Sequence, residues 1–211
     1  MAEARYRGEV VKLDRGYPLV RLEDGELLRC EHATALVKGE RRRAVIGDVV
    51  EVAVPPAHDK GVIEAIAPRT REFVRKDPTE RAVPQVLAAN FERVIVAQPV
   101  GEVNLRRLER ELVLAFETGA EVTVVLTKAD LADDAATRAT VEAVQALAAP
   151  AADVLVVSED DPASVEGVRA LLAPGTTTVL IGRSGVGKSS LVNMLVGADV
   201  FIGVSAPGAV T

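Results

Sequence analysis

The residues best suited to chemistry form a glycine-rich run near the end of the printed sequence. The run fits the pattern G-x-x-x-x-G-K-[ST] of a phosphate-binding loop, or P-loop, at every position. Its members, with one residue beyond the pattern, are Gly182, Arg183, Ser184, Gly185, Val186, Gly187, Lys188, Ser189 and Ser190. Because glycines let successive backbone N–H groups approach and surround a phosphate, the run predicts a site for nucleotide phosphates.

Lys188 and Ser189, the last two residues of the pattern, have separate predicted roles. Lys188 is placed to reach the β and γ phosphates, and the hydroxyl of Ser189 is placed to ligate Mg²⁺. We therefore predict Lys188 and Ser189 as the catalytic pair and Ser189 as the metal ligand. An apolar strand over 176–181 and a helix over 188–196 supply the context that this loop requires, with the positive helix end towards the phosphate.

A second motif precedes the P-loop and could read a base. Its four residues have the form [NT]-K-x-D and are Thr127, Lys128, Ala129 and Asp130. A carboxylate at Asp130 can accept hydrogen bonds from the two ring-edge donors of guanine, which adenine lacks, while the stem of Lys128 packs along the base. Taken alone, the motif also fits an ordinary strand-to-helix turn.

Ser158 is a further predicted contact to the base, through the backbone. It follows a predicted strand over 153–157, as the base motif follows a strand over 122–126. GTPases usually carry Ser-Ala at this point, whereas here Ser158 is followed by Glu159. The base motif ends 52 positions before the P-loop begins, and 22 residues follow Ser189, so the usual order of the motifs is permuted.

The elements that would position these motifs fall into two regions of different period. Five short runs rich in β-branched residues, bounded by turn signals, predict a small closed barrel of the OB type, although an undistinguished small β-domain also fits. These runs cover 8–13, 17–22, 26–30, 45–54 and 62–66. After residue 90 predicted strands and helices alternate, which indicates an α/β fold with a parallel, doubly wound sheet.

The helices and the domain limits follow from the same patterns. Asn104 is a predicted cap for a helix that Gly119 ends, and further helices are expected over 134–148 and 164–172. We predict an OB-type domain over 1–67, a linker over 68–90 and a partial α/β domain over 91–211.

Composition narrows the class of protein. The net charge is −6, with 15 Lys and Arg against 13 Asp and Glu in residues 1–76 and 10 against 18 afterwards. The first region is thus the predicted nucleic-acid face, and the basic run at 38–43 is either its phosphate contact or a solvated loop. No apolar run is long enough to span a membrane, so we expect a cytoplasmic monomer without a membrane partner. Cys30, His32 and His58 are too few for a structural zinc site.

The order of barrel, base motif, Ser158 and P-loop resembles the circularly permuted bacterial GTPases of the RsgA (YjeQ) type, which assist maturation of the small ribosomal subunit. The likeness extends to three further segments: 45–50 in the barrel, 66–69 at its exit and 88–94 entering the second domain. The resemblance implies GTP or GDP and Mg²⁺ as ligands. It also implies an OB-fold that contacts 16S rRNA, and GTP hydrolysis that rises on the small subunit.

Some parts of that family cannot be located in the sequence. These are the two switch regions, the closing strands of the sheet and the zinc-binding helical domain. Residues 201–211 match nothing expected, and the sequence at 205–208 departs from the D-x-P-G pattern. We therefore expect a chain truncated on its C-terminal side that binds guanine nucleotide weakly with little hydrolysis.

Two other functions remain open from the residues alone. One is an ATP-using P-loop enzyme in which the base motif is coincidental, and equal affinity for ADP and GDP would favour it. The other is an RNA-binding module with a vestigial nucleotide site, which the barrel would support if neither nucleotide bound.

Overall fold

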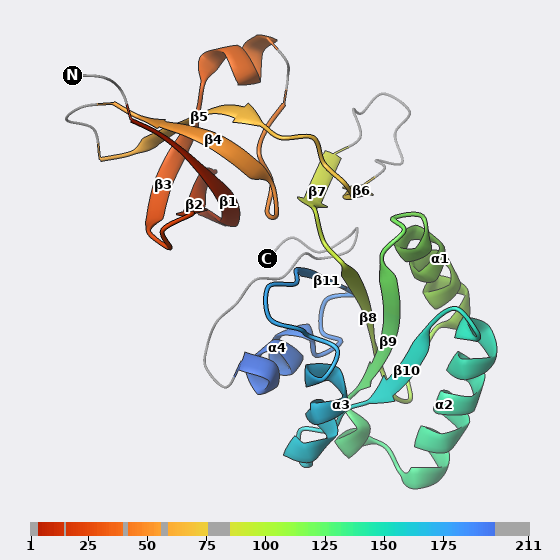
Figure 1. Cartoon of the computed structure of the whole chain (residues 1–211). Helices are drawn as coiled ribbons and strands as arrows, with labels where there is room; N and C mark the ends of the chain where they lie inside the picture. Colours follow the sequence, from red (N-terminus) through yellow and green to blue (C-terminus); the bar gives the residue numbers. More distant parts are fainter. Residues whose placement is uncertain (1–3, 15, 40–41, 56–58, 76–84, 197–211) are drawn as a thin grey trace. The chain divides into compact units, whose positions relative to one another are not determined.

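The chain of 211 residues forms two compact units in a computed structural model, Met1–Asn90 and Phe91–Thr211 (Figure 1). The structure describes all residues except 1–3, 15, 40–41, 56–58, 76–84 and 197–211. The predicted phosphate contact at 38–43 falls partly outside the described residues, and the unmatched stretch 201–211 falls wholly outside them.

The first unit contains a closed five-stranded barrel with the strand order β1-β2-β3-β5-β4. Its strands are β1 (Ala4–Asp14), β2 (Tyr17–Leu22), β3 (Leu27–His32), β4 (Val49–Val54) and β5 (Gly61–Ile66). All pairs are antiparallel except β3 with β5, and β1 closes the barrel by pairing with both β2 and β4. The predicted OB-type barrel is confirmed.

The barrel core consists of the inward-facing residues of all five strands and of the short helical segment η1 (Ala35–Gly39). Cys30 lies in this core beside Val52 and Ile63, and none of the three is exposed to more than 1%. Burial raises the pKa of the Cys30 thiol to about 11, so the thiol is neutral and acts as a small apolar side chain.

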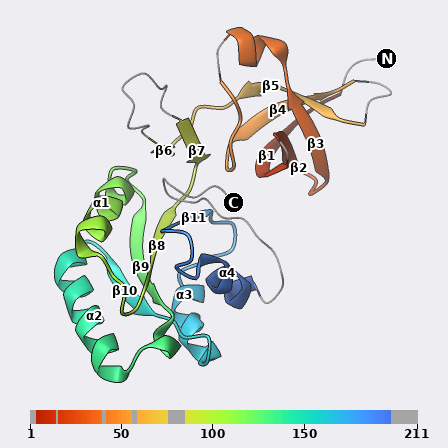
Figure 2. The same cartoon turned by 180° about the vertical axis from the view of Figure 1, so that it is seen from behind.

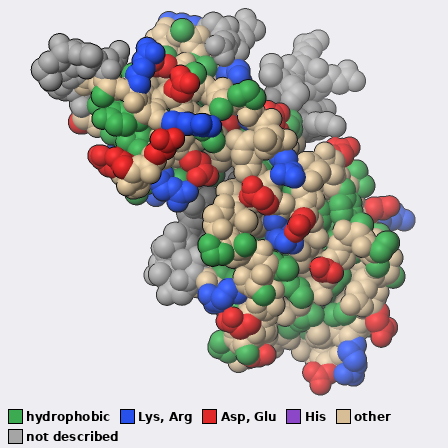
Figure 3. Space-filling view, viewed as in Figure 1, with side chains coloured by type: hydrophobic (Ala, Val, Ile, Leu, Met, Phe, Trp, Pro, Cys, Tyr) green, Lys and Arg blue, Asp and Glu red, His purple; other side chains and the backbone are tan. Residues whose placement is uncertain are grey.

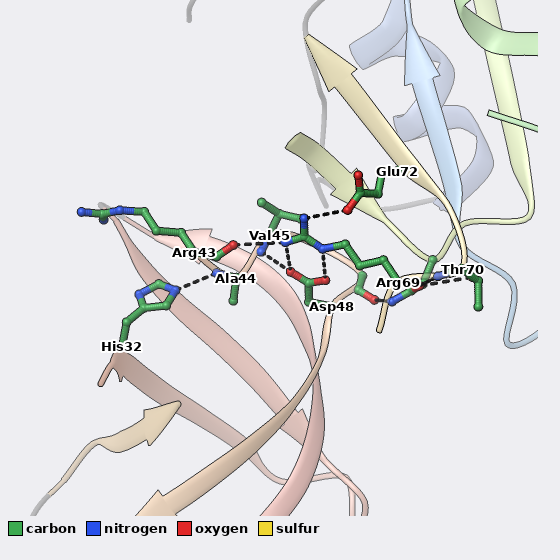
Figure 4. A network of polar contacts seen from close by, with 10 residues as sticks. His32, Arg43, Ala44, Val45, Asp48, Arg69, Thr70 and Glu72 are labelled. Atoms are coloured by element: carbon green, nitrogen blue, oxygen red, sulfur yellow. Dashed lines mark hydrogen bonds and ion pairs between the residues drawn. The ribbon is translucent and has the colours of Figure 1, made fainter. Parts of the chain in front are cut away.

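A buried ion pair joins the segment before β4 to the segment that leaves the barrel (Figure 4). The Arg69 guanidinium donates from Nε and Nη2 to the two carboxylate oxygens of Asp48, at 2.7 and 2.8 Å. Asp48 is fully buried, and the Arg69 side chain is 8% exposed. Val45 N–H also donates to Asp48, and Arg69 reaches the Arg43 carbonyl and Glu72. Every charge in the network therefore has an opposite charge or a dipole beside it.

The last residue of the segment predicted as a linker, Asn90, also bonds to the turn before β4. This segment carries β6 (Glu72–Arg75) and β7 (Gln85–Ala89), which pair antiparallel. Asn90, at φ 52°, donates through its side-chain amide to the Gly47 carbonyl at 2.8 Å and accepts from Thr70 N–H. Gly47 has φ 87°, and a Cβ there would lie 1.9 Å from the Ala89 carbonyl oxygen, so only glycine fits.

The second unit is a four-stranded parallel sheet with the order β10-β9-β8-β11. Its strands are β8 (Arg93–Pro99), β9 (Glu121–Thr127), β10 (Asp153–Val156) and β11 (Thr178–Ile181). Helices α1 (Leu105–Phe116) and α2 (Asp134–Ala148) cover one face, and α3 (Glu166–Arg169) and α4 (Lys188–Val196) lie on the other (Figures 1 and 2). The predicted α/β architecture is therefore confirmed.

Local sequence accounts for where these elements begin and end. Asn104 caps α1 by accepting from Arg107 N–H, and Gly119 follows the helix with φ 70°. Asp133 caps α2 in the same way, and α2 and α4 have the predicted limits. The helix expected over 164–172 instead begins as the 3₁₀ segment η3 (Pro162–Val165) and continues into α3, because Pro162 starts it and Asp161 caps it.

Candidate nucleotide-binding site

The predicted site residues gather at one edge of the parallel sheet. The base motif follows β9, Ser158 comes two residues after β10, and the P-loop follows β11. Since parallel strands present their carboxyl ends at the same edge, three segments far apart in sequence meet there. This edge is where open α/β sheets bind ligands.

The P-loop has the backbone shape that its glycines allow. Gly182, Gly185 and Gly187 have φ values of 144°, 82° and 88°. A Cβ at Gly182 would lie 2.6 Å from the Ala97 carbonyl oxygen, so the loop starts in direct contact with the end of β8. Arg183, Ser184 and Gly185 are exposed at its tip, whereas Val186 is buried beneath it.

Lys188 and Ser189 lie in the first turn of α4. The Lys188 ammonium donates to the carbonyls of Gly182 and Arg183, both at 2.8 Å, and so lies across the loop. Burial lowers the pKa of Lys188, and the carboxylate of Glu111 opposes that shift. Ser189 is exposed, which leaves its hydroxyl free to face a ligand at the positive end of the helix.

The base motif is fastened to the P-loop by its first residue. The buried Thr127 hydroxyl lies 2.5 Å from the Val186 carbonyl oxygen and 3.2 Å from that of Gln98. Lys128 has φ 58° and ψ 35°, a left-handed conformation that is costly for a residue with a Cβ. Ala129 N–H donates to the Val157 carbonyl, which ties the motif to the end of β10.

Asp130 and the loop after β10 contact each other directly. Glu159 N–H donates to the Asp130 carboxylate at 3.1 Å. The loop is held by Ser164, whose hydroxyl accepts from Ser158 N–H at 3.0 Å and lies against the carbonyls of Ser158 and Asp161. The predicted acceptor Asp130 therefore lies beside the loop after β10, but it bonds to the N–H of Glu159, and the N–H of the predicted contact Ser158 is bonded to Ser164.

A small pocket separates the base motif from α4. Its lining includes the stem of Lys128, Glu159 and two residues of α4, Ser190 and Met194. Among the described residues no group of three or more His, Cys, Asp or Glu side chains could hold a metal ion. A Mg²⁺ ion at this edge would need oxygens from a bound phosphate in addition to the Ser189 hydroxyl.

Two residues near the site are not predicted from the sequence. Gln98 and Glu111 are buried at 4% and 6% exposure and hydrogen-bond to each other behind the P-loop. The available signal was a charged residue, Glu111, at a position of α1 where the helical period requires an apolar one.

Comparisons with known proteins agree with this geometry. The family model described as RsgA GTPase matches residues 66–205. The small ribosomal subunit biogenesis GTPase RsgA of Streptomyces avermitilis is 40% identical over 200 residues, which are 94% of this chain and 53% of that protein. The Bordetella pertussis protein of the same name is 32% identical over 93% of this chain and 62% of its own length. The chain thus spans about half to two thirds of these relatives.

Solved structures show the same fold. The crystal structure of YjeQ from Thermotoga maritima matches with a TM-score of 0.72 and 27% identity, over 91% of this chain and 65% of that one. The structure of YloQ, described as a circularly permuted GTPase, matches with a TM-score of 0.66 over 90% of this chain and 64% of that one. With the family model covering more than half of the sequence, the chain belongs to the RsgA GTPase family.

Proposed function

We propose that this chain binds GDP and GTP with Mg²⁺ and belongs to a factor that acts in small ribosomal subunit biogenesis. The observation that carries the proposal is the direct link between the two motifs, Thr127 against the Val186 carbonyl. This hydrogen bond holds the base motif and the P-loop at a constant separation, as is required if one nucleotide is to contact both. The names of the relatives in Streptomyces and Bordetella support the biological role.

In the proposed complex each side chain has one task. Asp130 accepts hydrogen bonds from the guanine edge, and Lys128 packs along the base. The loop that begins at Ser158 offers the Glu159 N–H, since the Ser158 N–H is bonded to the Ser164 hydroxyl. The P-loop N–H groups and Lys188 hold the phosphates, while Ser189 ligates Mg²⁺, which neutralises phosphate charge. The Asp130 carboxylate accepts from Glu159 N–H in this structure, so guanine would replace Glu159 as a donor to that carboxylate on binding. We propose that residues 1–211 alone hydrolyse GTP slowly.

The test is a calorimetric titration with GDP and, separately, ADP in Mg²⁺. We expect selective GDP binding, weakened about tenfold or more by Asp130→Asn and by Lys188→Ala, since each removes charged hydrogen bonds. Arg138→Gln, an exposed change on α2, serves as the control and should leave affinity unchanged. Equal affinity for ADP and GDP would favour the ATP-using enzyme. Binding of neither nucleotide by a folded chain would favour the RNA-binding module with a vestigial nucleotide site.

We further propose that the barrel contacts ribosomal RNA. Tyr17 is 38% exposed, and two cations lie over its ring, with Arg29 at 5.4 Å and Lys60 at 4.9 Å from the ring centroid. Aromatic faces with cations beside them are suited to stacked bases and phosphates. On the face shown in Figure 3, however, basic and acidic side chains are mixed over the barrel. We therefore expect modest affinity that depends on stacking as well as on charge.

Binding to a 16S rRNA fragment at several salt concentrations tests this part. Tyr17→Ala should weaken binding several-fold at every salt concentration, because stacking is worth about 1–3 kcal/mol per base. Arg29→Gln should instead reduce the dependence of affinity on salt. Unchanged binding in both variants would contradict the assignment of RNA contact to this face.

A further inference from the structure

The buried carboxylate of Glu111 is the least expected feature of the second unit. It lies on α1 next to Leu108 and Leu112, on the face that covers β8 and β9, and is 6% exposed. A buried charge lowers stability unless partners compensate for it. The groups that contact Glu111 therefore decide whether its charge can be buried there.

Both oxygens of Glu111 are held. Gln98 Nε2 donates to Oε2 at 2.5 Å, and Arg107 Nε donates to Oε1 at 3.0 Å. Gln98 is itself 4% exposed and is the next-to-last residue of β8, while Arg107 lies one turn earlier on α1. The carboxylate thus fixes the end of β8 relative to α1 in one orientation.

That end of β8 meets the P-loop directly at Gly182 and indirectly through Thr127. A Cβ built on Gly182 would lie only 2.6 Å from the Ala97 carbonyl oxygen, so the backbone at the start of the loop packs directly against it. The Gln98 carbonyl oxygen lies 3.2 Å from the Thr127 hydroxyl, which also contacts the Val186 carbonyl in the middle of the loop. A shift of residues 97–98 would therefore be passed to both parts of the loop.

The charge of Glu111 also acts on the same loop. Its carboxylate stabilises the ammonium of Lys188 electrostatically, against the effect of burial. Glu111 thus influences the P-loop in two ways. It holds the end of β8, on which the loop backbone packs, and it stabilises the charge of Lys188.

We propose that Glu111 is a positioning residue for phosphate binding, which acts through Gln98 and Thr127 to hold the P-loop in its phosphate-accepting shape. The inference rests on the proposed binding of guanine nucleotide by this chain. A purely structural role in anchoring α1 would instead affect the whole unit and would not distinguish phosphate from base.

The test compares GDP with guanosine, which has the base and no phosphate. Glu111→Gln keeps the shape of the side chain but removes its charge and places an amide donor towards Arg107. We expect about a tenfold loss of affinity for GDP and a change of less than about twofold for guanosine, measured by displacement of a fluorescent GDP. Glu109→Gln, an exposed charge on the same helix, is the matched control and should change neither affinity.

Two further variants complete the design. The double swap Gln98→Glu with Glu111→Gln restores a carboxylate paired with an amide and should recover most of the GDP affinity. Arg107→Gln, on the half-exposed side of the network, tests the idea if Glu111→Gln fails to fold, with an expected loss of about threefold for GDP alone.

The outcomes separate this inference from the proposed function. Equal losses for GDP and guanosine, or no loss in a folded Glu111→Gln protein, would overturn the positioning role while leaving nucleotide binding intact. Absence of GDP binding by the unaltered chain would overturn the proposed function, and the positioning role with it.

Discussion

At the scale of single residues, the sites that matter most are those where a polar side chain is buried and fully partnered. Asp48 with Arg69 in the barrel unit and Glu111 with Gln98 in the second unit are of this kind. No buried side-chain N or O among the described residues lacks a hydrogen-bond partner. Replacing one member of such a group removes a hydrogen-bond partner from a buried polar atom, which is costly because water cannot reach the atom to replace it.

The Asp48–Arg69 pair gives a stability prediction. Asp48→Asn should lower the free energy of unfolding of the barrel unit by about 3 kcal/mol, since it leaves the buried Arg69 guanidinium with only the exposed carboxylate of Glu72 as a counter-charge. Arg69→Met should do the same, and the double variant should lose less than the sum of the two. Urea unfolding of all three proteins measures this. Strictly additive losses would show that the pair is not coupled.

His32 gives a pH prediction. Its Nε2 accepts from Ala44 N–H at 2.9 Å, which requires the neutral imidazole (Figure 4). Burial and then the charge of Arg43 lower the pKa of His32, while Asp48 acts in the opposite direction. Because the folded pKa is below the unfolded value, the stabilisation is complete above about pH 6.5 and is lost as the pH falls through the folded pKa.

The measurement is the urea midpoint of the barrel transition between about pH 5 and pH 8. His32→Gln keeps an acceptor for Ala44 N–H but does not titrate, so its midpoint should fall less steeply on the acid side than that of the unaltered chain. Identical slopes in the two proteins would exclude His32 as the source of the acid dependence.

At the scale of elements, α4 connects stability to the site because its first turn carries Lys188 and Ser189. Its last turn is held by Arg169 of α3, which donates to the carbonyls of Met194 and Leu195 at 2.9 and 2.6 Å. A cation at this end satisfies carbonyls that the helix leaves without partners and also favours its dipole. The helix is therefore fixed at the end opposite to the ligand.

Arg169→Leu should destabilise α4 by about 1 kcal/mol. We expect the backbone amides of residues 191–195 to exchange hydrogen faster in this variant. Its affinity for GDP should fall only a few-fold. Arg138→Leu, an exposed change on α2, is the control. Exchange rates in α4 that match the control would show that Arg169 does not hold this helix.

At the scale of the whole molecule, each unit has a separate apolar core. The barrel core is formed around Val10, Val20 and Ile63, and a core of the second unit around Ile95, Val125 and Leu180. No helix of the described residues is long and apolar enough to cross a membrane. Units with cores of their own are expected to unfold separately.

The two tyrosines allow that separation to be measured. Tyr6 and Tyr17 both belong to the barrel unit, and the chain has no tryptophan, whereas helices α1 to α4 belong to the second unit. Saturation with GDP at about 100 times its Kd should stabilise the helical transition by about 2.7 kcal/mol and leave the tyrosine fluorescence transition in place. A joint shift of both signals would show that the units unfold together.

The sequence by itself determined the barrel, the α/β alternation and the identity of the two motifs. These depend on local rules: β-branched runs between turns, Asn104 and Asp133 as helix caps, and glycines at positive φ in the P-loop. Residues 68–90 were predicted as a linker, and β6 and β7 lie there. The domain limits and the roles of the individual site residues remain predictions.

Only the tertiary structure decided which distant residues meet. The pairs Asp48 with Arg69, Gly47 with Asn90 and Thr127 with Val186 are 21, 43 and 59 positions apart. Local propensity carries no information on such contacts, because they arise when separate strands and loops pack and buried polar atoms must find partners. For the same reason the sequence marks Glu111 only as a charged residue at an apolar position of its helix, and its contact with Gln98 follows from the packing of α1 on β8.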